Sequence, residues 1–216
     1  MPFVPGLPVL LAFTLAGLVL FLTPGPDMSL WLAKTVAGGR RAGLAAMAGT
    51  MVGCCVHAAL AAAGVSVLVA ASPVAFAALK VTGALYLLWL AWGALRHGST
   101  LAVEEPGGPP AALPAWPLFL TGLGVNLANP KVVIFFITFL PGFVAASDPH
   151  AGGKLLFLGL YFVAFNAALA VALVLGAARV VGWLRRSPRV LRLIDYAFSA
   201  VFVAFAAAIL RTGARS

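Results

Sequence analysis

Long apolar stretches alternate with short turns rich in glycine, proline or basic residues along almost the whole chain. These stretches lack the strict alternation of apolar and polar positions that a membrane β-strand needs, so they favour helices. A helix of about 20 apolar residues crosses the hydrocarbon core of a bilayer. The pattern predicts an all-α integral membrane protein with six transmembrane helices, the first one interrupted, over residues 5–37, 43–71, 74–95, 116–140, 154–178 and 193–210.

Proline motifs interrupt the first and fourth predicted spans. The first motif reads Thr23-Pro24-Gly25-Pro26-Asp27, and the second reads Asn126-Leu127-Ala128-Asn129-Pro130-Lys131. Proline has no N–H and clashes with the preceding turn, so neither motif fits an unbroken helix. Hydrocarbon cannot satisfy the freed backbone groups, so we expect both breaks to face protein or a wet cavity. A plain helix stop with Asp27 as the N-cap also fits the first motif, and a simple kink fits the second.

The two breaks divide the chain into similar halves. Placing Pro24 over Pro130 aligns residues 1–95 with residues 116–216 and sets His57 near Asn166. Three spans per half give the halves opposite orientations, and in transporters built this way the site lies where the broken helices meet. The sequence therefore predicts one transmembrane domain over residues 1–216, made of two inverted three-helix repeats joined by a cytoplasmic connector at 96–115. Helices 1 and 4 are broken, and Pro141 ends the fourth span.

Composition supports the membrane assignment and excludes some partners. The chain is 63% hydrophobic and 9% charged, whereas soluble domains carry roughly 25% charged residues. The net charge of +9 fits basic cytoplasmic loops that meet anionic lipid, and we expect no nucleic-acid partner.

Basic residues predict the orientation of the chain in the membrane. Those in the loops after the first, third and fifth spans are Lys34, Arg40, Arg41, Arg96, Arg179, Arg185, Arg186, Arg189 and Arg192. Basic loops stay in the cytoplasm, so both termini are expected on the periplasmic side. The stretch from Arg179 to Arg192 is interpreted as the most basic loop, and Asp195 as half of a surface ion pair with its arginines.

The candidate chemistry lies beside the breaks, where Asp27 and Lys131 have opposite charges. A charge within a membrane usually faces the interior of the bundle. We predict that Asp27 binds the α-ammonium and Lys131 the α-carboxylate of a zwitterion, with the amides of Asn126 and Asn129 beside them. Direct pairing of Asp27 with Lys131 in the empty state and snorkelling of Lys131 to the cytoplasmic surface remain alternatives.

Other polar residues in the spans are weaker candidates. Asp27 and His57 are predicted to carry the coupled proton, although a lone helical histidine is more often packed and hydrogen-bonded. Tyr161 and Asn166 are predicted to line the cavity, and Asn166 also suits a bond between helices. Thr23, Pro24, Gly25, Pro26, Pro130 and Pro141 are predicted to form the breaks and gates.

Enzyme chemistry is not expected. The sequence shows no nucleophile–base pair, metal-ligand cluster or glycine-rich phosphate loop, so we predict neither a catalytic residue nor a cofactor or metal. Cys54 and Cys55 are neighbours in an apolar helix and are interpreted as small packing residues, since adjacent cysteines rarely form a useful bridge.

The breaks carry a resemblance to a known family. Residues 22–27, the stretch 38–53 and Asn129-Pro130-Lys131, with the Phe135-Phe136 and Phe139-Leu140-Pro141 runs, are similar to the LysE/RhtB family of bacterial amino-acid exporters. That resemblance implies a proton-driven exporter of amino acids or their derivatives in the inner membrane, often a homodimer, with an acidic residue at the position of Asp27. The alternative is a membrane-embedded accessory or assembly subunit, or a lipid-handling protein, whose breaks serve packing alone.

Overall fold

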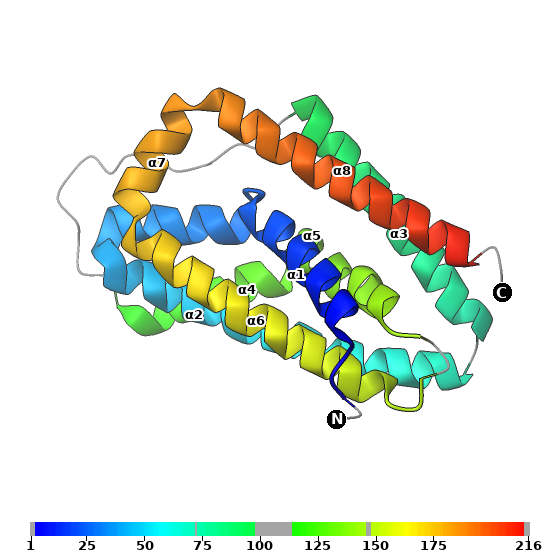
Figure 1. The fold of residues 1–216 in the computed structure, drawn as a ribbon. Coiled ribbons are helices and arrows are strands. Elements are labelled where there is room, and N and C mark those ends of the chain that lie inside the picture. The colour runs from blue at the N-terminus through cyan, green and yellow to red at the C-terminus, as the bar shows by residue number, and fades with distance from the viewer. Residues whose placement is uncertain (1–2, 72, 98–113, 146–147, 214–216) are drawn as a thin grey trace.

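The computed structural model describes residues 3–71, 73–97, 114–145 and 148–213, and its elements there are helices (Figure 1). They are α1 (Leu7–Leu22), α2 (Pro26–Ala71), α3 (Pro73–His97), α4 (Ala115–Leu127), α5 (Pro130–Ile134), the π-helical η1 (Phe135–Phe139), the 3-10 η2 (Leu140–Phe143), α6 (Ala151–Leu175), α7 (Ala177–Arg186) and α8 (Pro188–Gly213). The prediction of an all-helical protein is confirmed for this part of the chain. Most of the connector predicted at 96–115, residues 98–113, lies outside the described residues.

Several helices have the length and apolarity of a membrane span. Within the described residues, Pro26–Gly64 and Ala151–Leu175 each pass that test on their own. Helix α4 and the segment Pro130–Phe143 pass it together as a broken pair bent by 55°. Helix α1 is apolar but has only 16 residues, so it needs its continuation beyond the first break to cross a bilayer.

Helix α2 reverses its direction at Gly39. This glycine has φ 76° and ψ 178° within an otherwise helical stretch, a left-handed φ that glycine adopts without the steric penalty of a side chain. The two arms pack together, and Trp31 Nε1 donates to Thr50 Oγ1 at 3.0 Å between them. The first arm therefore follows directly from the first break, and the second arm runs back alongside it (Figure 1).

The helices form two groups with the broken segments between them (Figure 1). Helix α2 packs against α4 and α6, whereas α3 packs mainly against α8. The Gly- and Ala-rich sequence of α2 explains its central place: a Cβ at Gly49 would collide with the backbone of α4 at Phe119, and one at Gly53 with the amide of Asn126. Small residues let membrane helices approach closely and gain dispersion contacts.

The stretch that we predicted as the most basic loop is largely helical, so that prediction is wrong. Helix α7 spans Ala177–Arg186, and α8 begins at Pro188. Ala177 and Val181 are buried one turn apart, whereas Arg179 is exposed. Arg179 thus shares a short amphipathic helix with buried apolar residues, and burial of the apolar face favours helix over loop.

Asp195 also does not lie at the surface, as the predicted surface ion pair requires, because its side chain is only 1% exposed. Helix α8 packs against α3, and Ser199, four residues beyond Asp195, donates to the carbonyl of Ala91 in α3 at 2.9 Å. Residues four apart lie on the same face of a helix. That face of α8 is turned into the protein, and the exposed Arg192 also reaches α3, where its guanidinium donates to the carbonyl of Leu95 at 3.3 Å.

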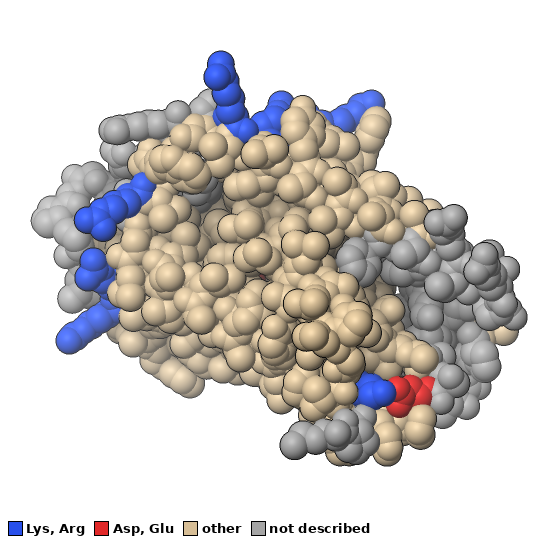
Figure 2. Space-filling model, in the orientation of Figure 1, with Lys and Arg blue, Asp and Glu red and all other residues tan. Residues whose placement is uncertain are grey.

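Exposed basic side chains gather at one end of the molecule. Figure 2 shows Lys and Arg side chains along the upper and left edges, the end at which α2 turns and α7 lies. Exposed residues there are Arg40, Arg41, Arg96, Arg179, Arg189 and Arg192.

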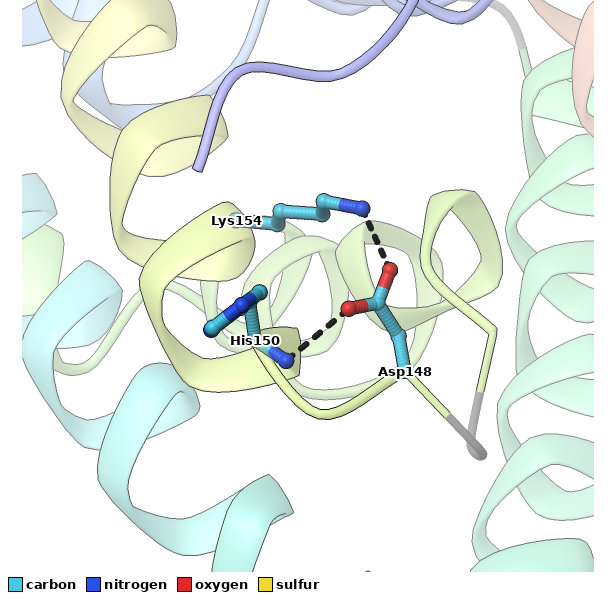
Figure 3. Close-up of polar contacts among 3 residues, drawn as sticks. All are labelled: Asp148, His150 and Lys154. Atoms are coloured by element: carbon cyan, nitrogen blue, oxygen red, sulfur yellow. Dashed lines mark hydrogen bonds and ion pairs between the residues drawn. The ribbon is translucent and has the colours of Figure 1, made fainter. Parts of the chain in front are cut away.

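The other end of the molecule carries a tied turn before α6 (Figure 3). Lys154 Nζ pairs with the carboxylate of Asp148, which also accepts the backbone N–H of His150 at 2.9 Å. The hydrogen bond from Lys154, helped by that backbone N–H, lowers the pKa of Asp148 below its ordinary value. The ring of His150 packs edge-on against Phe3, with 5.3 Å between ring centroids, so the turn also contacts the N-terminal segment.

Candidate functional site

The first break leaves main-chain carbonyls without helical partners. Helix α1 ends at Leu22, Thr23 N bonds back to Val19 O at 3.2 Å, and the chain becomes helical again at Pro26. The carbonyl of Leu20 would normally accept from the N–H of residue 24. That residue is a proline with no N–H. Helix α1 therefore presents an orphan acceptor at its C-terminal end.

The second break is built around two buried asparagines. Helix α4 ends at Leu127, α5 begins at Pro130, and the exposed fractions of Asn126 and Asn129 are 0% and 3%. Asn129 is the N-cap of α5, and its Oδ1 accepts the backbone N–H of Lys131 at 3.1 Å. This cap leaves the amide nitrogen of Asn129 available for a different partner.

Asp27 reaches from the first break to the second. Its Oδ2 accepts from Asn126 Nδ2 at 2.6 Å, and its Oδ1 accepts from Asn129 Nδ2 at 3.1 Å. Hydrogen bonds to an ionised group are stronger than those between neutral groups. The carboxylate is therefore held in a fixed orientation by the amides that sequence analysis placed beside it.

Lys131 makes the opposite crossing, from the second break to the first. Its Nζ donates to the carbonyls of Leu20 at 2.8 Å and Thr23 at 2.7 Å, and it lies 5.7 Å from the centroid of the Phe198 ring in α8. Asp27 and Lys131 form no salt bridge with each other in the described structure. Lys131 also does not extend to the surface, since its ammonium is bound inside the protein.

The charged residues occupy equivalent positions in the two breaks. Pro26 and Pro130 are each the first residue of the helix that restarts, and Asp27 and Lys131 follow them directly. Our alignment placed Pro24 over Pro130; the helix starts make Pro26 the counterpart. Each charge stands at the start of its own helix and binds groups of the other break.

A cavity lies where the two breaks meet. It has a volume of about 60 Å³, enough to hold water molecules. Its polar lining includes Asp27, Asn129, Lys131 and Asn166. The remaining lining is mainly apolar: Leu20, Phe21, Met28, Trp31, Met51, Cys54, Val132 and Phe162, with Thr23 and Gly25 from the break. The cavity thus joins a pair of opposite charges to an apolar wall.

Three of the polar side chains that we singled out lie outside this lining. Asn126 is fully buried behind Asp27. His57 packs on the ring of Phe136, with 5.8 Å between ring centroids, and its Nε2 lies 3.4 Å from the carbonyl of Asn126. Tyr161, which we expected in the cavity, instead shares a 2.8 Å hydrogen bond with Thr14. It faces α1 because positions 161, 162 and 165 of α6 pack against that helix.

Sequence analysis missed two parts of the site. Cys54, interpreted as a packing residue, lines the cavity, and its Sγ lies 3.4 Å from Asn126 Nδ2. Its spacing from Met51 and His57, one turn on either side, was a usable signal. The carbonyls of Leu20 and Thr23 were also missed, although a proline four residues after Leu20 marks an unsatisfied acceptor.

Known proteins are similar to this chain over most of its length. The model of the family described as LysE type translocator matches residues 18–213. A leucine efflux protein of Klebsiella pneumoniae is 28% identical over 197 residues, which cover 91% of this chain and 92% of that protein. A homoserine/homoserine lactone efflux protein of Salmonella typhimurium is 27% identical over 197 residues, with 89% and 91% covered. An uncharacterized membrane protein of Pseudomonas aeruginosa is 31% identical over 196 residues. No solved structure shows a significant match.

Proposed function

This chain belongs to the LysE type translocator family, and from that premise we propose that it exports amino acids or small amino-acid derivatives across the bacterial inner membrane by proton antiport. Two of the related proteins reported above, from Klebsiella pneumoniae and Salmonella typhimurium, are named as efflux proteins and not as enzymes. Their names support an amino-acid substrate for this chain, and a transport site in place of a catalytic one.

One observation carries the proposal: two broken helices exchange charged side chains across a shared cavity. Asp27 binds the amides of the second break, and Lys131 binds the carbonyls of the first. Broken helices that meet near the membrane midplane are the usual site of secondary transporters. A packing role alone does not require partly buried charges of both signs beside a cavity that can hold water, because burying a charge in a membrane is costly.

In the proposed complex, Asp27 binds the α-ammonium of the amino acid and Lys131 its α-carboxylate. Asn126 and Asn129 hold Asp27 in place. The side chain of the substrate lies against the apolar wall that includes Trp31 and Met51. Among the described residues that line the cavity, Asp27 and Lys131 are the charged ones, which supports a substrate with an uncharged side chain.

Asp27 is also the proposed proton carrier. Burial disfavours the ionised carboxylate, whereas its two amide donors favour it. Because these effects oppose each other, Asp27 can take up a proton when the cavity faces one side of the membrane and release it when the cavity faces the other. Asn126 connects this carboxylate to His57, because its side chain binds Asp27 and its carbonyl lies next to the ring of His57. We propose His57 as the second residue of this relay.

The proposed topology has six spans with both termini on the periplasmic side. The first arm of α2 completes the span that α1 begins, and α5 with η1 and η2 completes the span that α4 begins. The two halves are inverted repeats that give access to the cavity alternately from each side at the breaks. Basic side chains gathered at one end support a cytoplasmic location for that end (Figure 2).

Transport by the purified protein tests this function. In proteoliposomes with an acidic interior, a proton antiporter accumulates labelled leucine or homoserine as protons leave. Accumulation that requires the imposed pH difference is the expected result. Failure of the wild type to move any amino acid, tested over a panel of labelled neutral amino acids, would instead favour an accessory or lipid-handling role.

A further inference from the structure

We propose that the main-chain carbonyls of Leu20 and Thr23 form the ammonium site of the transported amino acid, and that Lys131 occupies this site while the cavity is empty. The inference rests on the proposed function and defines how its substrate binds. On entering, the zwitterion inserts between Lys131 and the carbonyls: its ammonium replaces that of Lys131, and its carboxylate takes Lys131 as a new partner.

The carbonyls have the properties of a cation site. Leu20 O lacks its helical donor because residue 24 is proline, and Thr23 O lies in the non-helical break. Both lie at the C-terminal end of α1, where the partial negative charge of the helix attracts cations. Both residues line the cavity, so a ligand in the cavity can reach them.

The position of Lys131 in its own helix is electrostatically unfavourable. It is the second residue of α5, and a positive charge near a helix N-terminus is unfavourable. Its ammonium extends across the break to the carbonyls at 2.8 Å and 2.7 Å. The charged side chain that faces it is Asp27 of α2, while α1 faces it with carbonyls and α8 with the ring of Phe198. A carboxylate placed at the start of α5 would be a better partner for Lys131 than the carbonyls are.

The number of donors matches the number of acceptors. An ammonium group has three N–H donors. The carbonyls of Leu20 and Thr23 and the carboxylate of Asp27 provide three acceptors that border the same cavity. With the zwitterion in place, its ammonium binds these three groups and its carboxylate binds Lys131, so every charge has an opposite charge beside it.

This exchange also changes how the broken helices are connected. Without substrate, Lys131 ties α5 directly to the end of α1. With substrate, the zwitterion replaces that link, and the helices separate by the length of its head group. A compound that lacks either charged group cannot complete the replacement. The site therefore selects zwitterions by requiring both the ammonium and the carboxylate.

Competition experiments on exchange test the inference. Proteoliposomes loaded with leucine exchange external labelled leucine without any pH difference, and two competitors are added in turn. Leucine methyl ester keeps the ammonium and lacks the carboxylate, whereas N-acetylleucine keeps the carboxylate and lacks the ammonium. Where exchange is too slow to measure, the shift in the thermal unfolding temperature of the purified protein on adding each compound reports whether that compound binds.

Substitution of Lys131 by Met should change the affinities for leucine and for leucine methyl ester in opposite directions. Leucine should bind about tenfold more weakly, since one lost charged contact is worth about 1.4 kcal/mol. The methyl ester should bind as well as or better than to the wild type, because it no longer displaces an ammonium from the carbonyls. Lys154→Met, in the turn before α6, is the matched control and should change neither affinity.

Substitution of Pro24 by Ala tests the carbonyls directly. It restores an N–H that can bond to Leu20 O and so removes one acceptor from the site. Leucine and its methyl ester should both bind several-fold more weakly, with N-acetylleucine unaffected. Pro117→Ala, at an exposed proline in α4, is the control for loss of a proline.

The outcomes separate this inference from the proposed function. Two results would overturn the ammonium site and leave the proposed export function standing. One is that Lys131→Met weakens the binding of leucine and of its methyl ester equally, and the other is that Pro24→Ala leaves exchange unchanged. Absence of exchange and of ligand-induced shifts in the wild type, for all neutral amino acids tried, overturns both. If the Met variant does not fold, Lys131→Arg replaces it in the test. Its guanidinium keeps the positive charge, so this variant should still bind leucine more tightly than the methyl ester.

Discussion

The side-chain amide of Asn126 donates to the carboxylate of Asp27 at 2.6 Å, although 99 positions separate the two residues in the sequence. Asn129 holds the second carboxylate oxygen at 3.1 Å. Both donors belong to the second proline break and the acceptor to the first. The breaks are therefore joined by directed polar bonds rather than by apolar packing alone, and the bonds fix the orientation of Asp27.

Replacing Asn126 by Leu keeps the branching of the side chain, adds some volume and removes its donor. The buried carboxylate of Asp27 then loses its shorter hydrogen bond, which should lower stability by about 1–3 kcal/mol and reduce export. Unfolding of the purified protein in mixed micelles measures the loss. Thr121→Val, at an exposed position in the same helix, should leave stability nearly unchanged. A stable Asn126→Leu protein with normal export would contradict this role.

Replacing Asp27 by Asn should separate coupling from binding. An amide cannot carry the coupled proton, so accumulation of amino acid driven by a pH difference should fall to the level of protein-free vesicles. Exchange between equal concentrations of amino acid on the two sides of the membrane needs no coupled proton, so it should persist. The apparent affinity of the variant for the amino acid should be about tenfold weaker, because one charged contact is lost. Uphill accumulation by the Asn variant at the wild-type rate would exclude Asp27 as the carrier.

Much of this architecture follows from single residues. Two prolines and a glycine at 24–26 and a proline at 130 cannot lie in unbroken helices, and their position between apolar stretches locates both breaks. The opposite charges of Asp27 and Lys131 identify them as partners of a polar cavity. These inferences need only local chemistry, because a missing N–H or a charge in an apolar segment has the same consequence in any fold.

Other features depend on which helices are neighbours. Asp195 lies three residues after Arg192, which favours a surface ion pair until the packing of α8 against α3 is known. The partner of Lys131 is likewise a main-chain carbonyl 111 positions away, and side-chain identities do not reveal it. Helix α7 was missed because five arginines in a short stretch resemble a loop more than an amphipathic helix.

Replacing Gly53 by Ala should disturb the site through packing. A Cβ at this position would overlap the amide of Asn126, so either the helices separate or the amide turns away from Asp27. Overpacking of this kind costs about 1–3 kcal/mol, and export should fall with stability. Gly64→Ala on the same helix is the control, because nothing lies within 4 Å of its Cβ. Equal stability of both variants would show that α2 and α4 tolerate wider separation.

Labelling of single cysteines tests the proposed orientation. In a protein with Cys54 and Cys55 replaced by Ala, His150→Cys should react with a membrane-impermeant maleimide in intact cells. Arg41→Cys should react only after the membrane is permeabilised, because it lies at the basic end that the positive-inside rule assigns to the cytoplasm. Labelling in the reverse order would place the termini in the cytoplasm and invert the proposed topology.

The turn before α6 should make stability depend on acid pH (Figure 3). The hydrogen bond from Lys154 lowers the pKa of Asp148 in the folded protein, so the unfolded chain takes up a proton at this site first as the pH falls. The contribution of Asp148 is complete above the ordinary aspartate value of about 3.9 and is lost as the pH falls through the lower folded value. The free energies of unfolding of the wild type and of Asp148→Asn should therefore differ by a constant amount between about pH 5 and pH 7, and should converge once the pH lies below the lowered folded pKa of Asp148.

Lys154→Met supplies the second arm of this experiment. If the ion pair is the cause, Asp148→Asn should have little further effect in the Lys154→Met background, because the strongest perturbation of the carboxylate is already gone. The pair is partly exposed, so added salt should shrink the difference between the wild type and Asp148→Asn. A difference that survives in the Lys154→Met background would mean that the backbone N–H of His150, and not Lys154, is the chief partner of Asp148. A difference that persists undiminished at acid pH would mean that it does not arise from the ionised carboxylate.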